Sequence, residues 1–214
     1  MILPAAVFRN ERDVEVPLFL DFLERHKPQS LVDVGAFYTH ATYARAARKL
    51  IPGTYIGVDP RICDKTEEIV NGWGNYEYSR ETRLFLECVS CISTLEHVGA
   101  ESSVAAERES QQLSLATAIL NDARKCAFLS FPFGREGWVK DSYSNITVEL
   151  LARILLEAER RGFTTSATFY RSSTPTDGGW EEIDSETASL EPFDLPSAPG
   201  FVGCHCVCIL GCWK

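Results

Sequence analysis

The chain opens on an apolar stripe with helical spacing and then changes to a shorter period. Positions 16, 19, 20 and 23 are apolar, so we predict an amphipathic helix over about 16–27, ended by Pro28. The next apolar run, 31–34, is short and ends at Gly35, which is typical of a buried strand in a parallel sheet.

The alternation of strand and helix patterns continues along most of the chain. Further strands are predicted at 55–58, 88–93 and 126–131, and helical stripes cover 43–51, 113–123 and 151–158. Strands that alternate with helices predict an α/β fold, with a Rossmann-like, mostly parallel sheet and helices on both of its faces.

The last third of the chain predicts a different arrangement. β-rich segments at about 165–171 and 202–213 flank an acidic, Pro/Gly/Ser-rich stretch over 172–200. We therefore expect a C-terminal antiparallel strand pair, joined by an excursion that forms either a lid over the site or a loop. Residues 1–214 are expected to form one domain, with an N-terminal helical segment over 1–29.

Charge and hydropathy narrow the class of protein. The 214 residues carry 21 Lys and Arg against 30 Asp and Glu, a net charge of −9 that argues against a nucleic-acid-binding surface. No stretch approaches the roughly 20 apolar residues that a membrane-spanning helix needs. Residues 1–7 are too short for the apolar part of a secretory signal, so we expect a cytoplasmic protein with no membrane partner.

The eight cysteines indicate buried thiols rather than disulfides or a metal site. Cys88 and Cys91 form a C-x-x-C pair, but side chains three positions apart on an extended strand point to opposite faces. Four other cysteines share one side of the last predicted strand, where thiols pack as small apolar groups; these are Cys204, Cys206, Cys208 and Cys212. We therefore expect no bound metal.

The residues that follow the first two strands are candidates for ligand binding, because ligands of open parallel sheets lie beyond the carboxyl ends of the strands. Gly35 lets the backbone pass close to a ligand. Asp59, 24 residues later, can accept hydrogen bonds from the hydroxyls of a ribose; alternatively it caps a helix or forms a turn before Pro60. Phe37 and His40 stand in two glycine positions of a G-x-G-x-x-G pattern, which disfavours pyrophosphate binding.

Four segments together resemble a known motif series. They are Leu31-Val32-Asp33-Val34-Gly35, Gly57-Val58-Asp59, the STLEHVG stretch at 93–99 and Phe131-Pro132-Phe133-Gly134. In this order they are similar to the motifs of class I S-adenosylmethionine-dependent methyltransferases, and with their strands they span about 30–134. The resemblance implies a seven-stranded sheet, S-adenosylmethionine as the cofactor and methyl transfer as the reaction.

The resemblance also implies which residues bind the cofactor. Residues 33–37 would flank its methionine part, Asp59 would hold the ribose, and residues 94–95 would lie near the sulfonium. Glu81 is the candidate for the adenine amine. The full cofactor-binding set is Asp33, Gly35, Ala36, Phe37, Tyr38, Asp59, Arg61, Thr94 and Leu95.

One departure from the family concerns the glycine-rich loop. Phe37 and Thr39 replace two glycines of the usual G-x-G-x-G pattern. An adenosyl cofactor without phosphates is compatible with that change. The alternative is a methyltransferase-like binding module that no longer holds a cofactor and is not an enzyme. A second alternative is an oxidoreductase with a nucleotide cofactor, for which Asp59 would serve equally well.

Glu96 and His97, within the 93–99 stretch, are the candidate catalytic residues. Methyl transfer to a hydroxyl needs a base for the hydroxyl proton, and an imidazole with a pKa near 6.5 suits that task. The alternative is structural: residues that follow a strand often hydrogen-bond to loop backbone, and Glu96 could cap the next turn.

Motifs that the chain lacks narrow the methyl acceptor. No Asn/Asp-Pro-Pro-aromatic segment follows the strand at 88–93, and there is no Pro-Cys dipeptide, so methylation of exocyclic nitrogen or of cytosine carbon is disfavoured. We expect a small-molecule or sugar-type acceptor, methylated at oxygen, and leave the oligomeric state open. Four aromatic residues could line the acceptor pocket or could pack within loops: Tyr38, Trp138, Tyr143 and Trp180. Trp138 and Tyr143 are the favoured candidates for the pocket.

Overall fold

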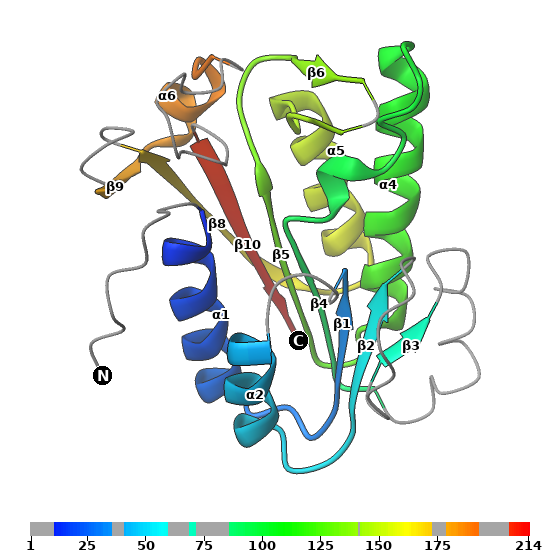
Figure 1. Ribbon diagram of the computed structural model, residues 1–214, viewed down its shortest axis with the longest axis vertical. Helices are drawn as coiled ribbons and strands as arrows, with labels where there is room; N and C mark the ends of the chain where they lie inside the picture. Colours follow the sequence, from blue (N-terminus) through cyan, green and yellow to red (C-terminus); the bar gives the residue numbers. More distant parts are fainter. Residues whose placement is uncertain are drawn as a thin grey trace.

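The computed structural model describes residues 11–35, 41–59, 69–71, 86–140, 142–172, 179–192 and 206–214. For residues 41, 42, 59 and 69–71 the description covers the backbone only. An eight-stranded sheet forms the centre, in the order β3-β2-β1-β4-β5-β10-β8-β9 (Figure 1). Its strands are β1 (Leu31–Val34), β2 (Tyr55–Asp59), β3 (Ile69–Asn71), β4 (Cys88–Ile92), β5 (Cys126–Pro132), β8 (Thr164–Ser172), β9 (Trp180–Ile183) and β10 (Cys206–Trp213).

Strand directions match the expected fold class. β1, β2, β3, β4 and β5 are joined by parallel pairings. β10 lies between β5 and β8 and is antiparallel to both. This confirms the α/β, mostly parallel sheet with a C-terminal antiparallel pair, and β9 extends the expected seven strands by one.

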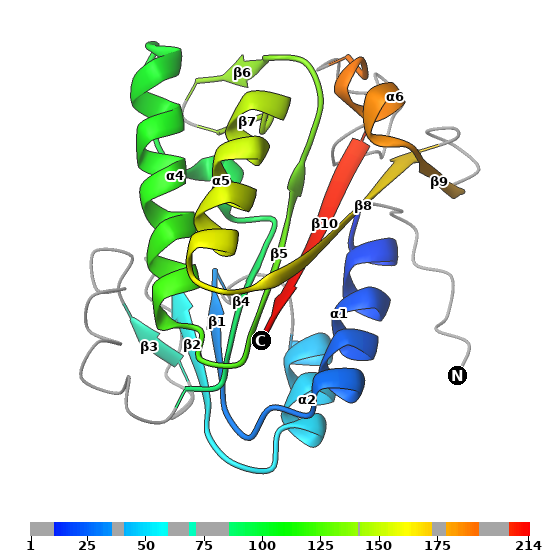
Figure 2. The same cartoon turned by 180° about the vertical axis from the view of Figure 1, so that it is seen from behind.

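Helices cover both faces of the sheet, as expected. α1 (Arg12–His26) and α2 (Ala41–Leu50) lie on one face, and α4 (Ala105–Asp122) and α5 (Val148–Arg160) lie on the other (Figures 1 and 2). Each face has its own apolar core. Because β4 is buried on both faces, all five of its side chains are buried.

The cysteines follow the predicted pattern. Cys88 belongs to the core under α1 and α2, whereas Cys91 belongs to the core under α4 and α5. The row on β10 is confirmed for three members, which are buried in the α4–α5 core as free thiols: Cys206, Cys208 and Cys212. Cys204 lies outside the described residues. Within the described part of the chain, no three His, Cys, Asp or Glu side chains are grouped so that they could hold a metal ion.

The 172–200 excursion contains regular structure that the composition did not indicate. β9 pairs with β8, and the short helix α6 (Ser185–Ser189) follows, capped by Asp184, whose carboxylate accepts from the Thr187 N–H at 2.8 Å. Arg171 on β8 forms ion pairs with Glu181 and Glu191, which compensates part of the negative charge. The rest of the excursion, 173–178 and 193–200, lies outside the described residues.

Two smaller elements complete the described structure near the carboxyl ends of the strands. The single-turn helix η3 (Leu95–His97) follows β4, and the ribbon of β6 (Trp138–Val139) and β7 (Tyr143–Ser144) follows β5. None of the described helices is both long and apolar enough to cross a bilayer.

Candidate functional site

Three strand ends meet at one edge of the sheet. Val34 is in register with Val58 on one side and with Cys91 on the other. The Gly35 N–H continues the ladder by donating to the Val58 carbonyl at 2.6 Å. The backbone of Gly35 therefore lies beside the end of β2, where Asp59 is the last residue. The backbones of Gly35 and Asp59 thus lie at the same edge of the sheet.

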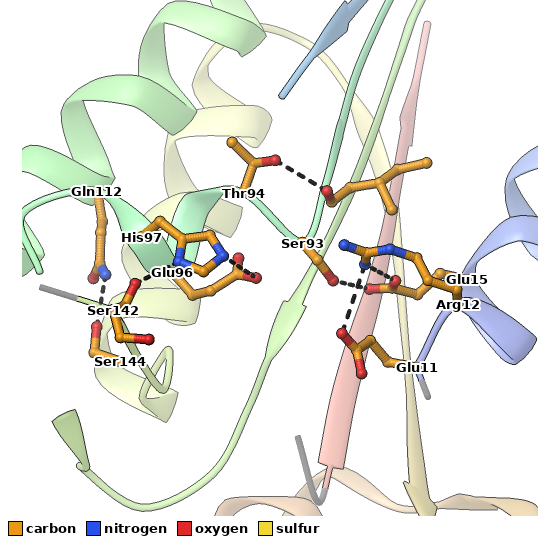
Figure 3. Close-up of polar contacts among 11 residues, drawn as sticks. Glu11, Arg12, Glu15, Ser93, Thr94, Glu96, His97, Gln112, Ser142 and Ser144 are labelled. Atoms are coloured by element: carbon orange, nitrogen blue, oxygen red, sulfur yellow. Dashed lines mark hydrogen bonds and ion pairs between the residues drawn. The ribbon is translucent and has the colours of Figure 1, made fainter. Parts of the chain in front are cut away.

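Gly35 is required at this edge for a reason that the sequence did not indicate. Its φ of +84° favours glycine, and a Cβ at this position would overlap the Thr94 hydroxyl. Thr94 is buried, and its hydroxyl donates to the Ile92 carbonyl at 3.0 Å (Figure 3). The chain after β4 thus packs directly against the turn after β1.

The Asp33 side chain is buried and hydrogen-bonded to other side chains, and it does not face an open site. Its buried carboxylate accepts hydrogen bonds from the hydroxyls of Tyr43, Tyr55 and Ser90, the last two at 2.8 Å. Burial raises the pKa of Asp33, and these three hydrogen bonds oppose the rise. The side chain links β1 to α2, β2 and β4, so only the backbone near Asp33 can face a ligand.

The remaining predicted cofactor residues divide into two groups. Leu95 is fully buried in the α4–α5 core, so its side chain acts in packing. The other group lies outside the described residues: Ala36, Phe37, Tyr38, Arg61 and Glu81. The Asp59 side chain is likewise not described.

His97 is presented to solvent in one orientation. Its side chain is 54% exposed, and Nδ1 is hydrogen-bonded to the Ser142 carbonyl in the loop between β6 and β7. Because a carbonyl can only accept, Nδ1 carries the proton and donates, which leaves the lone pair of a neutral ring on Nε2. Nε2 lies 3.7 Å from Oε1 of Glu96 (Figure 3).

Glu96 is the buried member of this pair. The residue is only 3% exposed, and its Oε2 has no hydrogen-bond partner among the described residues. Burial raises the pKa of Glu96 to about 8, although its own backbone N–H and the positive charge of Arg12 lower it. At neutral pH the carboxyl group is therefore mostly protonated.

Three residues at the N-terminal end of α1 also lie at this site, although the sequence analysis did not predict them: Glu11, Arg12 and Glu15. Arg12 pairs with Glu15, and its Nη1 lies 3.8 Å from Oε1 of Glu11. Glu15 is fully buried and accepts from the Ser93 hydroxyl at 2.7 Å. Ser93 itself has a φ of +40°, an uncommon backbone conformation outside glycine.

We refer to Glu11, Arg12 and Glu15, together with Glu96, which lies on the other side of Ser93 in Figure 3, as the carboxylate cluster. Burial raises the pKa of Glu11 to about 7, and the nearby Glu15 carboxylate adds to the rise. One sequence signal points to the cluster: Glu15 lies four and seven positions before Phe19 and Phe22, on the buried stripe of α1. A carboxylate on an apolar stripe requires a buried partner.

The aromatic candidates mostly pack within the protein. The Trp138 indole N–H donates to the Ala100 carbonyl at 2.7 Å, and the Arg108 guanidinium lies 5.0 Å from its ring centre, so loop packing describes Trp138. Trp180 packs against the α1–α2 core from β9. Tyr143 lies nearer the site, with its ring centre 6.4 Å from that of His97. Tyr38 lies outside the described residues.

Comparison with known proteins finds no match in sequence and distant matches among solved structures. No protein-family model and no curated protein matches the chain. Among solved structures, the precorrin-6y C5,15-methyltransferase of Geobacter metallireducens is 11% identical, with a TM-score of 0.46 over 97% of this chain and 94% of that one.

Two further structures are similarly distant. The magnesium protoporphyrin IX methyltransferase of Synechocystis PCC 6803, with bound SAH, is 11% identical, with a TM-score of 0.48 over 93% of this chain and 81% of that one. A SAM-dependent methyltransferase of Aquifex aeolicus is 10% identical, with a TM-score of 0.36 over 96% and 95% of the two chains.

Proposed function

We propose that this protein is an S-adenosylmethionine-dependent methyltransferase that acts on a hydroxyl of a small-molecule acceptor. The observation that carries the proposal is the meeting of Gly35 with the end of β2 at one edge of the sheet, with Thr94 packed against Gly35. This edge brings together three of the segments that resemble the methyltransferase motifs, in the place where open parallel sheets bind ligands.

The residues at this edge fit an adenosyl cofactor. The backbone at Gly35 can line the cofactor, and Asp59, one register step beyond Val58, can accept from ribose hydroxyls. Thr94 occupies the volume that a Cβ at Gly35 would take, so the turn after β1 and the segment after β4 pack directly against each other. When bound, S-adenosylmethionine supplies a methyl group whose C–S bond breaks as the acceptor oxygen bonds to carbon, leaving a neutral thioether.

His97 is the proposed base for the acceptor hydroxyl. Its Nδ1–H is held by the Ser142 carbonyl, so Nε2 is free to take the hydroxyl proton as the oxygen forms its new bond. The resulting imidazolium lies 3.7 Å from Glu96, and its positive charge favours ionisation of that carboxyl group. Glu96 therefore stabilises the protonated form of His97 from the buried side.

Thermal denaturation with added nucleotides tests the proposal. Ligands that bind only the native state raise apparent stability, so S-adenosylmethionine and S-adenosylhomocysteine should raise Tm, while NAD should not. Stabilisation by NAD alone would favour the oxidoreductase. No shift with any of the three would favour a binding module without cofactor.

A variant of Asp59 tests whether the cofactor binds at this edge of the sheet. Asp59→Asn should weaken S-adenosylhomocysteine binding about tenfold in calorimetry, because a charged hydrogen-bond acceptor for ribose is lost. Asp21→Asn, on the exposed surface of α1, serves as the matched control. Equal affinity for both variants would place the cofactor elsewhere.

A further inference from the structure

The carboxylate cluster contains more acidic groups than its guanidinium can pair. Both oxygens of Glu15 are used, one by Arg12 and the other by the Ser93 hydroxyl. Glu11 lies 3.8 Å from Arg12, and Glu96 interacts with Arg12 only at longer range. With all three carboxyl groups ionised, the four side chains of the cluster would carry a net charge of −2 in a buried place.

Two oxygens of the cluster are buried acceptors without a donor. Oε2 of Glu96 and Oε2 of Glu11 are enclosed, and neither accepts a hydrogen bond from any residue that the structure describes. An unsatisfied buried polar group destabilises the folded state, so native proteins rarely keep one without a reason. The charge of Glu96 adds to the rise in the pKa of Glu11, so the two carboxyl groups lie within electrostatic range of each other. Their unsatisfied oxygens indicate a ligand that donates hydrogen bonds.

The chemistry of the cluster selects the kind of ligand. Three carboxyl groups disfavour an anion, and the described residues provide no grouping of three ligands that would hold a metal ion. An ammonium group has three donors and no acceptor, which matches carboxylate oxygens that lack donors. The pKa values, raised to about 7 for Glu11 and about 8 for Glu96, leave Glu96 mostly protonated and Glu11 partly protonated at neutral pH, and a bound cation would displace these protons.

We propose that the carboxylate cluster binds the ammonium group of the methyl acceptor, so that the acceptor is an amino alcohol or amino sugar. The substrate class rests on the proposed methyltransferase function, whereas binding of an ammonium ion by the cluster does not. Glu96 joins the two parts of the site, because its Oε1 faces Nε2 of His97 while its Oε2 remains available as an acceptor. The methylated hydroxyl would therefore lie a few bonds from the amine.

Matched pairs of small molecules test the proposal by calorimetry at pH 7.5. The probes are 2-aminoethanol against ethylene glycol and glucosamine against glucose, each titrated with and without saturating S-adenosylhomocysteine. The amines should bind at least tenfold more tightly than their uncharged counterparts. Titrations in two buffers of different ionisation enthalpy should show proton release with 2-aminoethanol, because the cation displaces protons, chiefly from Glu96.

Variants locate the binding of the amine. Glu96→Gln and Glu11→Gln should each reduce amine affinity about tenfold and reduce the proton release. Both keep the shape of a protonated glutamate, so folding should be retained, which circular dichroism would check. Glu24→Gln, on the exposed side of the same helix, should behave as the unmodified protein.

The outcomes separate this proposal from the proposed function. Equal or undetectable binding of amines and glycols overturns the ammonium site, even if S-adenosylhomocysteine binds. Amine selectivity without S-adenosylhomocysteine binding supports the ammonium site and removes the methyltransferase function. If Glu96→Gln weakens S-adenosylhomocysteine and leaves the amines unchanged, the cluster holds the ammonium of the cofactor, and the proposal is wrong.

Discussion

Carboxyl groups at the two ends of the sheet differ in their exposure to solvent. At the amino end of β4, Glu87 accepts from the Gln29 N–H at 3.0 Å and lies 3.5 Å from Nζ of Lys125. It borders an open cleft of about 590 Å³, whose lining is Gln29, Ser30, Gly53, Thr54, Glu87, Arg124 and Lys125. At the carboxyl end, Glu15 and Glu96 are buried.

The comparison shows that the charged groups of the open cleft and those of the carboxylate cluster lie in different environments. In the cleft, water solvates the charges, so the pairing of Glu87 with Lys125 contributes little. In the carboxylate cluster, burial raises the pKa values of Glu11 and Glu96 and leaves one oxygen of each without a donor. Buried groups that the protein does not satisfy by itself mark the end where a ligand is expected.

Removing one carboxylate at each end should give the largest difference. Glu15→Ala leaves Arg12 and the Ser93 hydroxyl without their buried partner, and breaking a buried ion pair costs about 3–5 kcal/mol. Glu87→Ala should cost less than about 1 kcal/mol, as expected for a pair that reaches solvent. Urea unfolding of both variants measures the difference. Similar losses of stability would show that the two ends do not differ in the way described.

Neutralising one carboxyl group at each end of the sheet should change the pH dependence of folding stability at one end only. The pKa of Glu96 is about 8 in the folded protein and near 4.5 in the unfolded chain, so the folded state binds its proton more tightly. Stability is therefore lost as pH rises from about 4.5 to about 8, the range in which the unfolded chain ionises first.

Glu96→Gln should remove this loss. At pH 8.5 the variant should be more stable than the unmodified protein by roughly 4 kcal/mol, and at pH 5 the two should differ by less than about 1 kcal/mol. Glu87→Gln, at the solvated end, should change stability by less than about 0.5 kcal/mol at either pH. Unfolding curves at the two pH values decide. A Glu96→Gln variant that is less stable at pH 8.5 would mean that the carboxylate has a partner.

The sequence predicted the parts of the fold that depend on apolar pattern. Strands such as β1 and β5 are continuous buried runs, which have few other interpretations. The first two turns of α4 were missed because they are polar, with Arg108 and Gln112 as their buried residues. β9 was missed because two of its four residues are glutamates, and it is held by pairing with β8.

The candidate site was predictable only where topology alone decides position. Parallel strands end at one edge, so the amino-acid pattern by itself places Gly35, Asp59 and Thr94 together. The carboxylate cluster depends on how α1 packs against the turn after β4. Glu15 and Ser93 are 78 positions apart, and no local pattern joins them. The contact of His97 with the Ser142 carbonyl likewise arises from loop packing across 45 positions.

Replacing one histidine at each end should give the smallest changes in stability and the clearest separation of roles. His26, at the C-terminal end of α1, stacks with Phe22 and Trp213, with ring centres 4.3 and 5.4 Å away. His26→Ala should therefore cost about 1 kcal/mol of stability, typical of a lost aromatic pair, and leave turnover unchanged.

His97 is exposed, so His97→Ala should change stability by less than about 0.5 kcal/mol. Turnover, measured as S-adenosylhomocysteine formed with an amine-bearing acceptor, should fall about 100-fold, because the hydroxyl proton loses its base. If the folded His97→Ala variant keeps full turnover, the ring serves only to anchor the loop at Ser142, and the base must be sought elsewhere along the same edge.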